Sequence, residues 1–213
     1  VNVLLDAGAD VDLAYENRET TILQDAAFYP DKSDIFILLF DKYPRFRSGD
    51  SEGNTLLHYL ASSNHNRVDA MRRLTNLGFS LEETNHKDRS VLLASIGCIP
   101  ISISGYDVSP NLENFRFVLE QGPDPSFYSR APETNPASWL LLNLYSLSWS
   151  EKLKLLEELE RFGLNDYSGI DYDGDTFLHR SAKQGLYEPC DFLLTRGLDP
   201  HKVNERTGRS AFQ

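Results

Sequence analysis

Residues 50–61 read DSEGNTLLHYLA, and residues 171–182 read DYDGDTFLHRSA. Residue types that the two stretches share at the same offsets include Gly53, Thr55, Leu57, His58 and Ala61 in the first and Gly174, Thr176, Leu178, His179 and Ala182 in the second. Glycine readily takes the positive φ that a tight turn requires. Threonine and histidine side chains can hydrogen-bond the backbone donors that lack partners at the start of a helix. Each stretch therefore predicts a tight turn that leads directly into a closely packed helix.

The second stretch also carries three alternating aspartates, Asp171, Asp173 and Asp175. A calcium loop of the EF-hand type needs a glycine at position six and a glutamate at position twelve. Counted from Asp171, these positions hold Thr176 and Ala182, so the spacing argues against calcium, which we keep only as an easily tested alternative. We predict instead that Asp171 hydrogen-bonds within the turn and that Asp173 and Asp175 are free to make contacts.

The same pattern recurs along the chain at intervals of 34 to 48 residues. Equivalent turn positions fall at Glu19, Gly53, Asp88, Pro136, Gly174 and Gly208. Equivalent helix-ending positions fall at Gly8, Tyr43, Gly78, Gly122, Gly163 and Gly197. Because the two sets of markers keep step with each other, the sequence predicts an array of repeated units, each of which must stack on its neighbours to bury its apolar residues.

In its period and its turn motif the chain resembles the ankyrin repeat, whose signature is T-P-L-H-x-A at about 33 residues. The resemblance implies an all-α fold, a solenoid of stacked helix-turn-helix units with β-hairpin-like loops. It covers essentially the whole chain as a single domain, residues 1–213. We expect a partial repeat at 1–15, a partial repeat at 205–213, and full repeats near 16–49, 50–84, 85–132, 133–170 and 171–204. Since the pattern is cut within a repeat at both ends, we expect a fragment of a longer protein.

Several positions depart from the pattern. Glu19, Asp88 and Pro136 replace the turn glycine, which predicts a different turn, and Gln24, Leu93 and Leu141 replace the histidine, which predicts helix starts that rely more on packing. The segment 97–114, rich in glycine, proline and serine, reads as a long loop inserted between two helices. Such a loop is either functional or a product of sequence drift, and the sequence does not decide between them.

Composition and motifs exclude several classes of function. The formal net charge is −11, from 21 basic and 32 acidic residues, which argues against nucleic-acid binding. No apolar run reaches the roughly 18 residues that a membrane helix needs. Two distant cysteines, Cys98 and Cys190, indicate a reducing intracellular compartment, the cytoplasm or the nucleus. Neither a nucleophile elbow, nor a phosphate loop, nor zinc-ligand spacing is present, so we expect no enzyme, no metal and no cofactor.

The resemblance implies a protein-interaction scaffold that binds a partner on a concave surface of hairpin tips and first helices. Aromatic and arginine side chains are the usual anchors of interfaces. We therefore expect an unidentified protein partner, and the acidic net charge of the chain weakly favours a basic one. The residues expected to contact it are Phe28, Tyr29, Lys87, Arg89, Tyr145, Tyr172, Asp173 and Asp175. Some of these aromatic residues would instead pack between repeats. An alternative function is a regulatory or structural segment of a larger multidomain enzyme, packed against a catalytic domain.

Overall fold

The computed structural model describes residues 6–10, 20–29, 33–42, 49–97, 110–122, 136–142, 147–164 and 167–213. The chain divides into two compact units, residues 1–123 and 124–213, which are described separately. The first contains α2 (Ile22–Phe28), α3 (Ser33–Lys42), α4 (Leu56–Ser62), α5 (Val68–Asn76), α6 (Val91–Ser95) and α7 (Leu112–Glu120). The second contains α8 (Pro136–Leu142), α9 (Trp149–Arg161), α10 (Phe177–Lys183) and α11 (Tyr187–Thr195).

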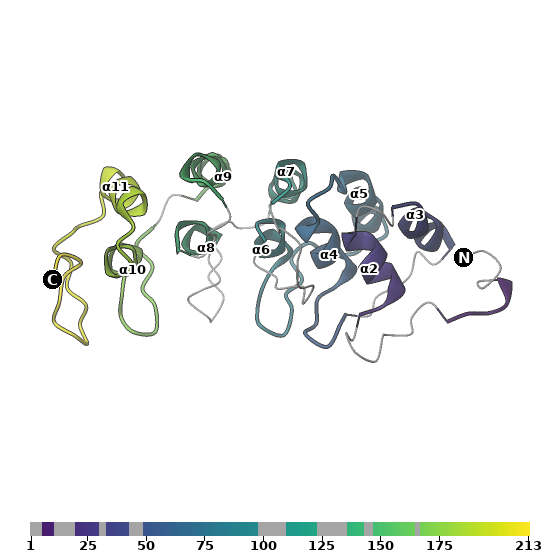
Figure 1. The fold of residues 1–213 in the computed structure, drawn as a ribbon, viewed down its shortest axis with the longest axis horizontal. Helices are drawn as coiled ribbons and strands as arrows, with labels where there is room; N and C mark the ends of the chain where they lie inside the picture. Colours follow the sequence, from purple (N-terminus) through teal and green to yellow (C-terminus); the bar gives the residue numbers. More distant parts are fainter. Residues whose placement is uncertain are drawn as a thin grey trace. The chain divides into compact units, whose positions relative to one another are not determined.

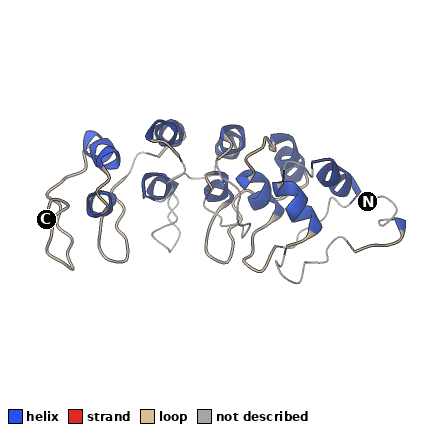
Figure 2. Ribbon diagram, in the orientation of Figure 1, coloured by secondary structure: helices blue, strands red, loops and turns tan. Residues whose placement is uncertain are grey.

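Within each unit the helices form two layers (Figure 1). In the first unit α2, α4 and α6 form one layer and α3, α5 and α7 the other, while in the second unit α8 and α10 lie beside α9 and α11. The described regular structure is helical (Figure 2). In the described loops between repeats, the backbone forms only isolated β-bridges, such as Thr84 with Ser90 and Ile170 with Thr176. The predicted all-α fold of helix pairs and hairpin-like loops is therefore confirmed.

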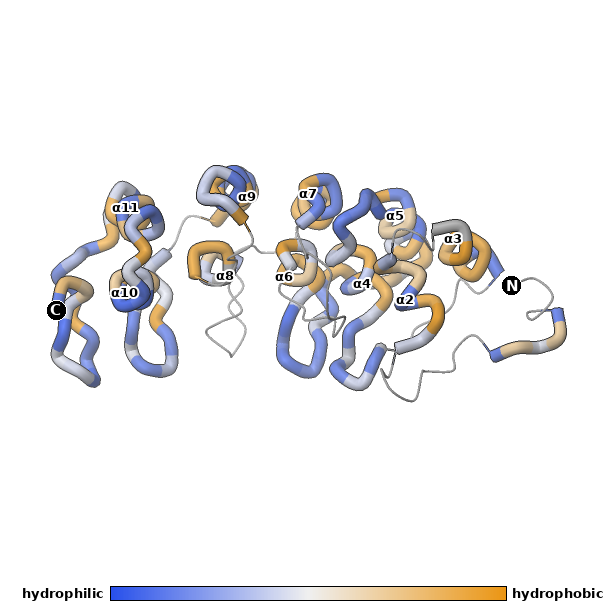
Figure 3. The backbone as a smooth tube through the Cα atoms, in the orientation of Figure 1, coloured by the Kyte–Doolittle hydropathy of each residue, from blue (hydrophilic) through white to orange (hydrophobic). Residues whose placement is uncertain are grey.

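Apolar residues concentrate in the helices, and the hairpin loops are mostly polar (Figure 3). The first-layer helices are short and buried over most of their length, as in α4, where every residue from Leu56 to Ser62 is buried. The second-layer helices are amphipathic: α9 buries Leu155, Leu156 and Leu159 and exposes charged residues on its other side. Amphipathic helices of this kind bury one face and leave the other to solvent.

Threonine and histidine begin the first-layer helices as the sequence predicts. At α4 the Thr55 backbone N–H donates to His58 Nδ1 over 3.1 Å, and at α10 the Thr176 N–H donates to His179 Nδ1 over 3.3 Å. The opposite ring nitrogen then carries the proton, and Nε2 of His58 donates to the Arg89 carbonyl over 3.1 Å. One side chain thus caps its own helix and joins it to the next hairpin.

Gln24 corrects the expectation that a helix start without histidine relies more on packing. Its Oε1 accepts from the Thr21 backbone N–H over 2.8 Å, and the Thr21 hydroxyl accepts from the Gln24 N–H over 3.3 Å. Its Nε2 also donates to the Asn54 carbonyl over 3.4 Å. The glutamine amide has a donor and an acceptor at about the same reach as the imidazole, so it makes both of the histidine's connections.

The turn before α6 is more regular than the sequence suggests, whereas Pro136, predicted as a turn position, is instead the first residue of α8. Asp171 accepts at Oδ1 from the backbone N–H groups of Asp173 and Asp175, both at 2.9 Å, which confirms its predicted turn role. Asn85 does the same for Lys87 and Arg89 in its own hairpin. Asp88, which replaces the turn glycine there, has a φ of +56°, so it adopts the left-handed conformation and no different turn is needed.

Asn114 connects three helices of the first unit. Its side chain is fully buried, and its Oδ1 accepts from the Arg67 backbone N–H over 2.7 Å. Its Nδ2 donates to three backbone carbonyls near the end of α4, those of Leu60 at 3.2 Å, Ser63 at 3.0 Å and His65 at 2.8 Å. Because Asn114 lies in the first turn of α7, the predicted loop 97–114 is too long by its last residues; its central part, 98–109, lies outside the described residues.

Ser181 in α10 is a buried hydroxyl for which the described residues supply no hydrogen-bond partner. It lies five residues after its N-cap, the position held by Ala26 in α2, so alanine fits there. We expect Ser181→Ala to raise the free energy of unfolding by about 1 kcal/mol, because it removes an unsatisfied polar group. Urea denaturation followed by circular dichroism measures this change.

Ser95 in α6 is the matched control, since it occupies the same helical position but its hydroxyl donates to the Leu92 carbonyl over 2.7 Å. Ser95→Ala should lower the free energy of unfolding by roughly 1 kcal/mol. Equal effects of the two substitutions would show that the hydroxyl's hydrogen bond does not decide the outcome.

Candidate functional site

Phe28 and Tyr29 lie in the core of the first unit and are each only 7% exposed. Their rings pack edge to face with centroids 5.5 Å apart. The carbonyl of Phe28 accepts from the Ser63 hydroxyl and that of Tyr29 from the Arg67 guanidinium. These two residues follow the alternative in which aromatics pack between repeats, and we remove them from the candidate surface. Tyr145 lies outside the described residues.

The hairpin tips of the first unit are linked to each other. The His86 backbone N–H donates to the Glu52 carbonyl over 2.8 Å, and the Lys87 ammonium pairs with the Glu52 carboxylate at 2.5 Å. Lys87 is exposed, whereas Arg89 is half-buried and its carbonyl accepts from His58. Lys87 is therefore accessible to a partner but already carries a counter-ion, and Arg89 contributes mainly to the stacking of repeats.

The close approach of these two hairpins depends on Gly53. Its φ is +79°, and a Cβ atom added there would lie 2.7 Å from the His86 ring and 3.0 Å from the His86 backbone nitrogen. Gly78 also has a positive φ, +88°, but a Cβ atom there would meet nothing within 4 Å. We expect Gly53→Ala to lower the free energy of unfolding by about 1–2 kcal/mol more than Gly78→Ala, because only the first adds a clash to the backbone strain. Equal losses in urea denaturation would contradict the stacking of His86 on Gly53.

In the second unit, Asp175 corrects the expectation that it is free to make contacts. It is only 4% exposed, pairs with Lys183, and accepts from the Asn204 amide over 2.6 Å. Burial alone would raise the pKa of the Asp175 carboxyl, but the hydrogen bonds from Lys183 and Asn204 outweigh it and lower that pKa. Asp175 therefore holds the two neighbouring hairpins together.

Tyr172 and Asp173 remain at the tip of the hairpin that leads into α10. Tyr172 is 62% exposed, and the Asp173 side chain is exposed too. The backbone of Asp173 is fixed, since its N–H donates to Asp171 and its carbonyl accepts from Asn204. The turn thus presents one aromatic ring, that of Tyr172, and one carboxylate, that of Asp173, to solvent. Both residues are therefore accessible to a partner.

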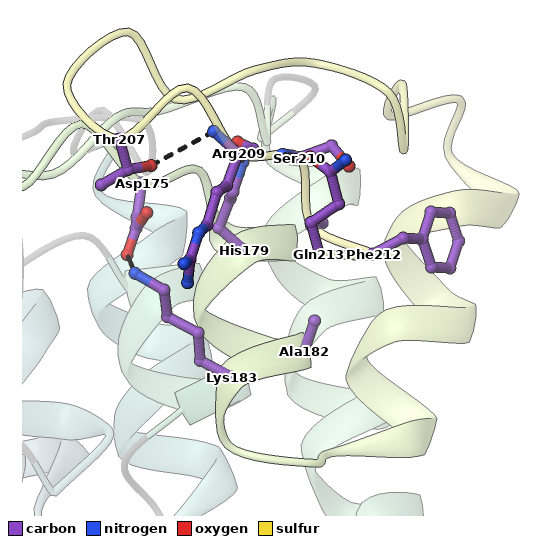
Figure 4. A pocket seen from close by; sticks show the side chains of 10 residues that line it. Asp175, His179, Ala182, Lys183, Thr207, Arg209, Ser210, Phe212 and Gln213 are labelled. Carbon is purple, nitrogen blue, oxygen red and sulfur yellow. Dashed lines mark hydrogen bonds and ion pairs between the residues drawn. The ribbon is translucent and has the colours of Figure 1, made fainter.

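A pocket of about 620 Å³ lies next to this tip, between α10 and the segment 207–213 (Figure 4). Lys183 and Arg209 line one side of it and Phe212, which is 70% exposed, lies on the other. His179 at its floor donates to the Arg209 carbonyl. The pocket combines cations, hydroxyl groups and an aromatic ring, which suits contact with a polypeptide better than with an apolar small molecule.

The described residues contain no group of three histidine, cysteine or acidic side chains placed to hold a metal ion. None of the described helices has the length and apolar character needed to cross a bilayer.

Neither a family model nor a curated protein matches the chain at the level of sequence. Solved structures do match: the ankyrin repeat domain of Bcl-3, a member of the IkappaB protein family, aligns with a TM-score of 0.63 and 18% identity over 99% of this chain and 83% of that one. This is an ankyrin-repeat fold. A second match comes from the complex of Bd0816, a predatory endopeptidase of Bdellovibrio bacteriovorus, with the immunity protein Bd3460, at a TM-score of 0.66 and 18% identity over 91% and 89% of the two chains. At this identity the likeness establishes the ankyrin-repeat fold alone.

Proposed function

We propose that this ankyrin-repeat chain is a protein-interaction scaffold that binds a partner protein through its hairpin tips and first-layer helices, the surface expected to be concave in such arrays. The observation that supports this proposal is that the residues of the hairpin 168–176 have two different roles. Asp171 accepts hydrogen bonds from the backbone of the turn, and Asp175 is buried and pairs with Lys183. Tyr172 and Asp173 are exposed on the same turn. A scaffold with fixed backbone and exposed aromatic and charged groups loses little entropy on binding.

The comparisons support a protein partner in general terms, since one of the similar solved chains belongs to a complex between two proteins. The net charge of −11 supports a partner with a basic surface, because opposite charges accelerate and orient association. No catalytic group is part of the proposal.

The test is a pull-down from cell lysate with the chain and two double variants. Tyr172→Ala with Asp173→Ala removes the exposed tip, and Tyr187→Ala with Glu188→Ala removes an exposed aromatic and acid from α11 instead. We expect the tip variant to retain at least tenfold less partner and the α11 variant to match the parent, with unchanged urea midpoints for both. Loss with the α11 variant alone would move the site to the second layer, and the absence of any partner would favour a segment that packs within its own parent protein.

A further inference from the structure

Aromatic rings close to a carboxylate bind arginine side chains within this chain, and the two rings that do so are themselves buried, since Phe40 is 2% exposed and Phe192 4%. In α3 the adjacent residues Phe40 and Asp41 hold the guanidinium of Arg73 from α5. The Arg73 guanidinium lies 4.8 Å from the centroid of the Phe40 ring, and its Nη2 lies 2.5 Å from the Asp41 carboxylate. The ring supplies a cation–π contact and the carboxylate an ion pair to the same group.

The second unit contains the same combination. The Arg196 guanidinium lies 3.5 Å from the centroid of the Phe192 ring, and it donates to both carboxylate oxygens of Glu160, at 2.6 Å and 3.1 Å. The Tyr167 hydroxyl donates to the same carboxylate over 2.9 Å. Two separate places in the molecule therefore bind arginine with one aromatic ring and one carboxylate.

Tyr172 and Asp173 offer these two groups on adjacent residues, with no arginine bound to them. Within the described residues the Asp173 carboxylate has no ion pair or side-chain hydrogen bond, and Tyr172 has no ring or cation contact. The arginines of the next hairpin, Arg206 and Arg209, are exposed and make no such contact either. The chain thus leaves an arginine-binding pair unfilled at the tip where the proposed partner surface is most exposed.

One other exposed pair, Tyr187 and Glu188 at the start of α11, differs in a decisive way. Burial lowers the pKa of Lys152, and the nearby Glu188 carboxylate opposes that lowering, so Glu188 already has a cation of the chain beside it. Tyr187 is 76% exposed, more than Tyr172, which makes the pair a control for exposure without an available carboxylate.

We propose that the Tyr172–Asp173 pair is a receptor for one arginine side chain of the partner protein. This inference rests on the proposed function and specifies the chemistry of the partner at one point. Arginine fits better than lysine because its planar guanidinium can lie on the ring while its N–H groups reach the carboxylate in a fixed fork, as Arg196 does on Phe192 and Glu160.

The test is an NMR titration of the ¹⁵N-labelled chain with the capped tripeptide acetyl-Gly-Arg-Gly-amide. The matched probe replaces arginine by citrulline, which has nearly the same shape and no charge. We expect saturable shifts at the Tyr172 and Asp173 signals with the arginine peptide, in the millimolar range of a single exposed contact, and at least fivefold weaker binding of the citrulline peptide. Asp173→Asn and Tyr172→Ala should each weaken arginine binding at least fivefold, while Glu205→Gln, which removes another exposed acid from the next hairpin, should not.

Equal shifts with both peptides, or an equal effect of Glu205→Gln and Asp173→Asn, would overturn the arginine receptor. Larger shifts at Tyr187 and Glu188 than at Tyr172 and Asp173 would overturn it as well. These outcomes leave the scaffold function standing if the tip variant still loses its partner in the pull-down. If that variant keeps its partner while the peptide binds as expected, the proposed partner surface fails instead.

Discussion

Asn114→Ala is expected to lower the free energy of unfolding by about 3–5 kcal/mol, because it removes the partner of the buried Arg67 N–H and of the buried Ser63 carbonyl, and each such loss costs roughly 1–3 kcal/mol. The fully buried side chain accepts from the Arg67 N–H and donates to three carbonyls near the end of α4. No other residue of α7 reaches these groups in the described structure. The change in the urea midpoint at constant slope measures the loss.

Asn111 supplies a control three residues earlier in the same helix. It caps α7 by accepting from the N–H groups of Glu113 and Asn114, both at 3.1 Å, and it is half-buried, with its Nδ2 donating to the Asn64 carbonyl over 3.2 Å. Asn111→Ala should cost only about 1 kcal/mol, the usual value of an N-cap. If Asn114→Ala costs no more than Asn111→Ala, the buried connection between α4, α5 and α7 does not stabilise the first unit.

Acid is expected to weaken the first unit through His58. Burial lowers the pKa of His58 from 6.5 to about 4, although the bond to the Arg89 carbonyl and the charge of Asp50 oppose this. The folded pKa lies below the unfolded one, so the unfolded chain binds more protons between these values. The stability that the neutral ring provides is complete above pH 6.5, and we expect it to fall by about 3 kcal/mol as the pH drops to 4.

Gln24 shows how to separate this effect from the titration of other groups. It makes the histidine's two connections in the preceding junction with a side chain that does not titrate. His58→Gln should therefore keep most of the stability at pH 7 and remove most of the loss between pH 6.5 and 4, as measured by urea denaturation at each pH. A pH profile that is unchanged by His58→Gln would show that other groups cause the acid sensitivity.

The features that the sequence predicts well act over a few residues. Thr55 and His58, or Thr176 and His179, cap a helix through contacts three residues apart, so their pattern is visible in the chain itself. Asp171 builds its turn within four residues in the same way. The repeat period then follows because each unit must reproduce this local arrangement.

What the sequence does not predict depends on contacts between repeats. Asn114 bonds to residues 47 to 54 positions away, and no local pattern distinguishes it from Asn111. Asp173 and Asp175 have the same charge in the same hairpin. Asp175 is the buried one because Asn204 of the next hairpin donates to its carboxylate and Lys183 of α10 pairs with it. Phe28 and Tyr29 likewise owe their burial to the helices around them. The sequence therefore predicts which hairpin carries the candidate site, but it does not predict that only Tyr172 and Asp173 of that hairpin are exposed.

Photo-crosslinking in cells tests directly whether a partner protein binds at the hairpin tips. Benzoylphenylalanine introduced in place of Tyr172 reports on the tip, and the same residue in place of Tyr187 reports on α11 with equal or greater exposure. We expect a discrete crosslinked protein from position 172 and none from position 187. A partner crosslinked only from position 187 would contradict this expectation.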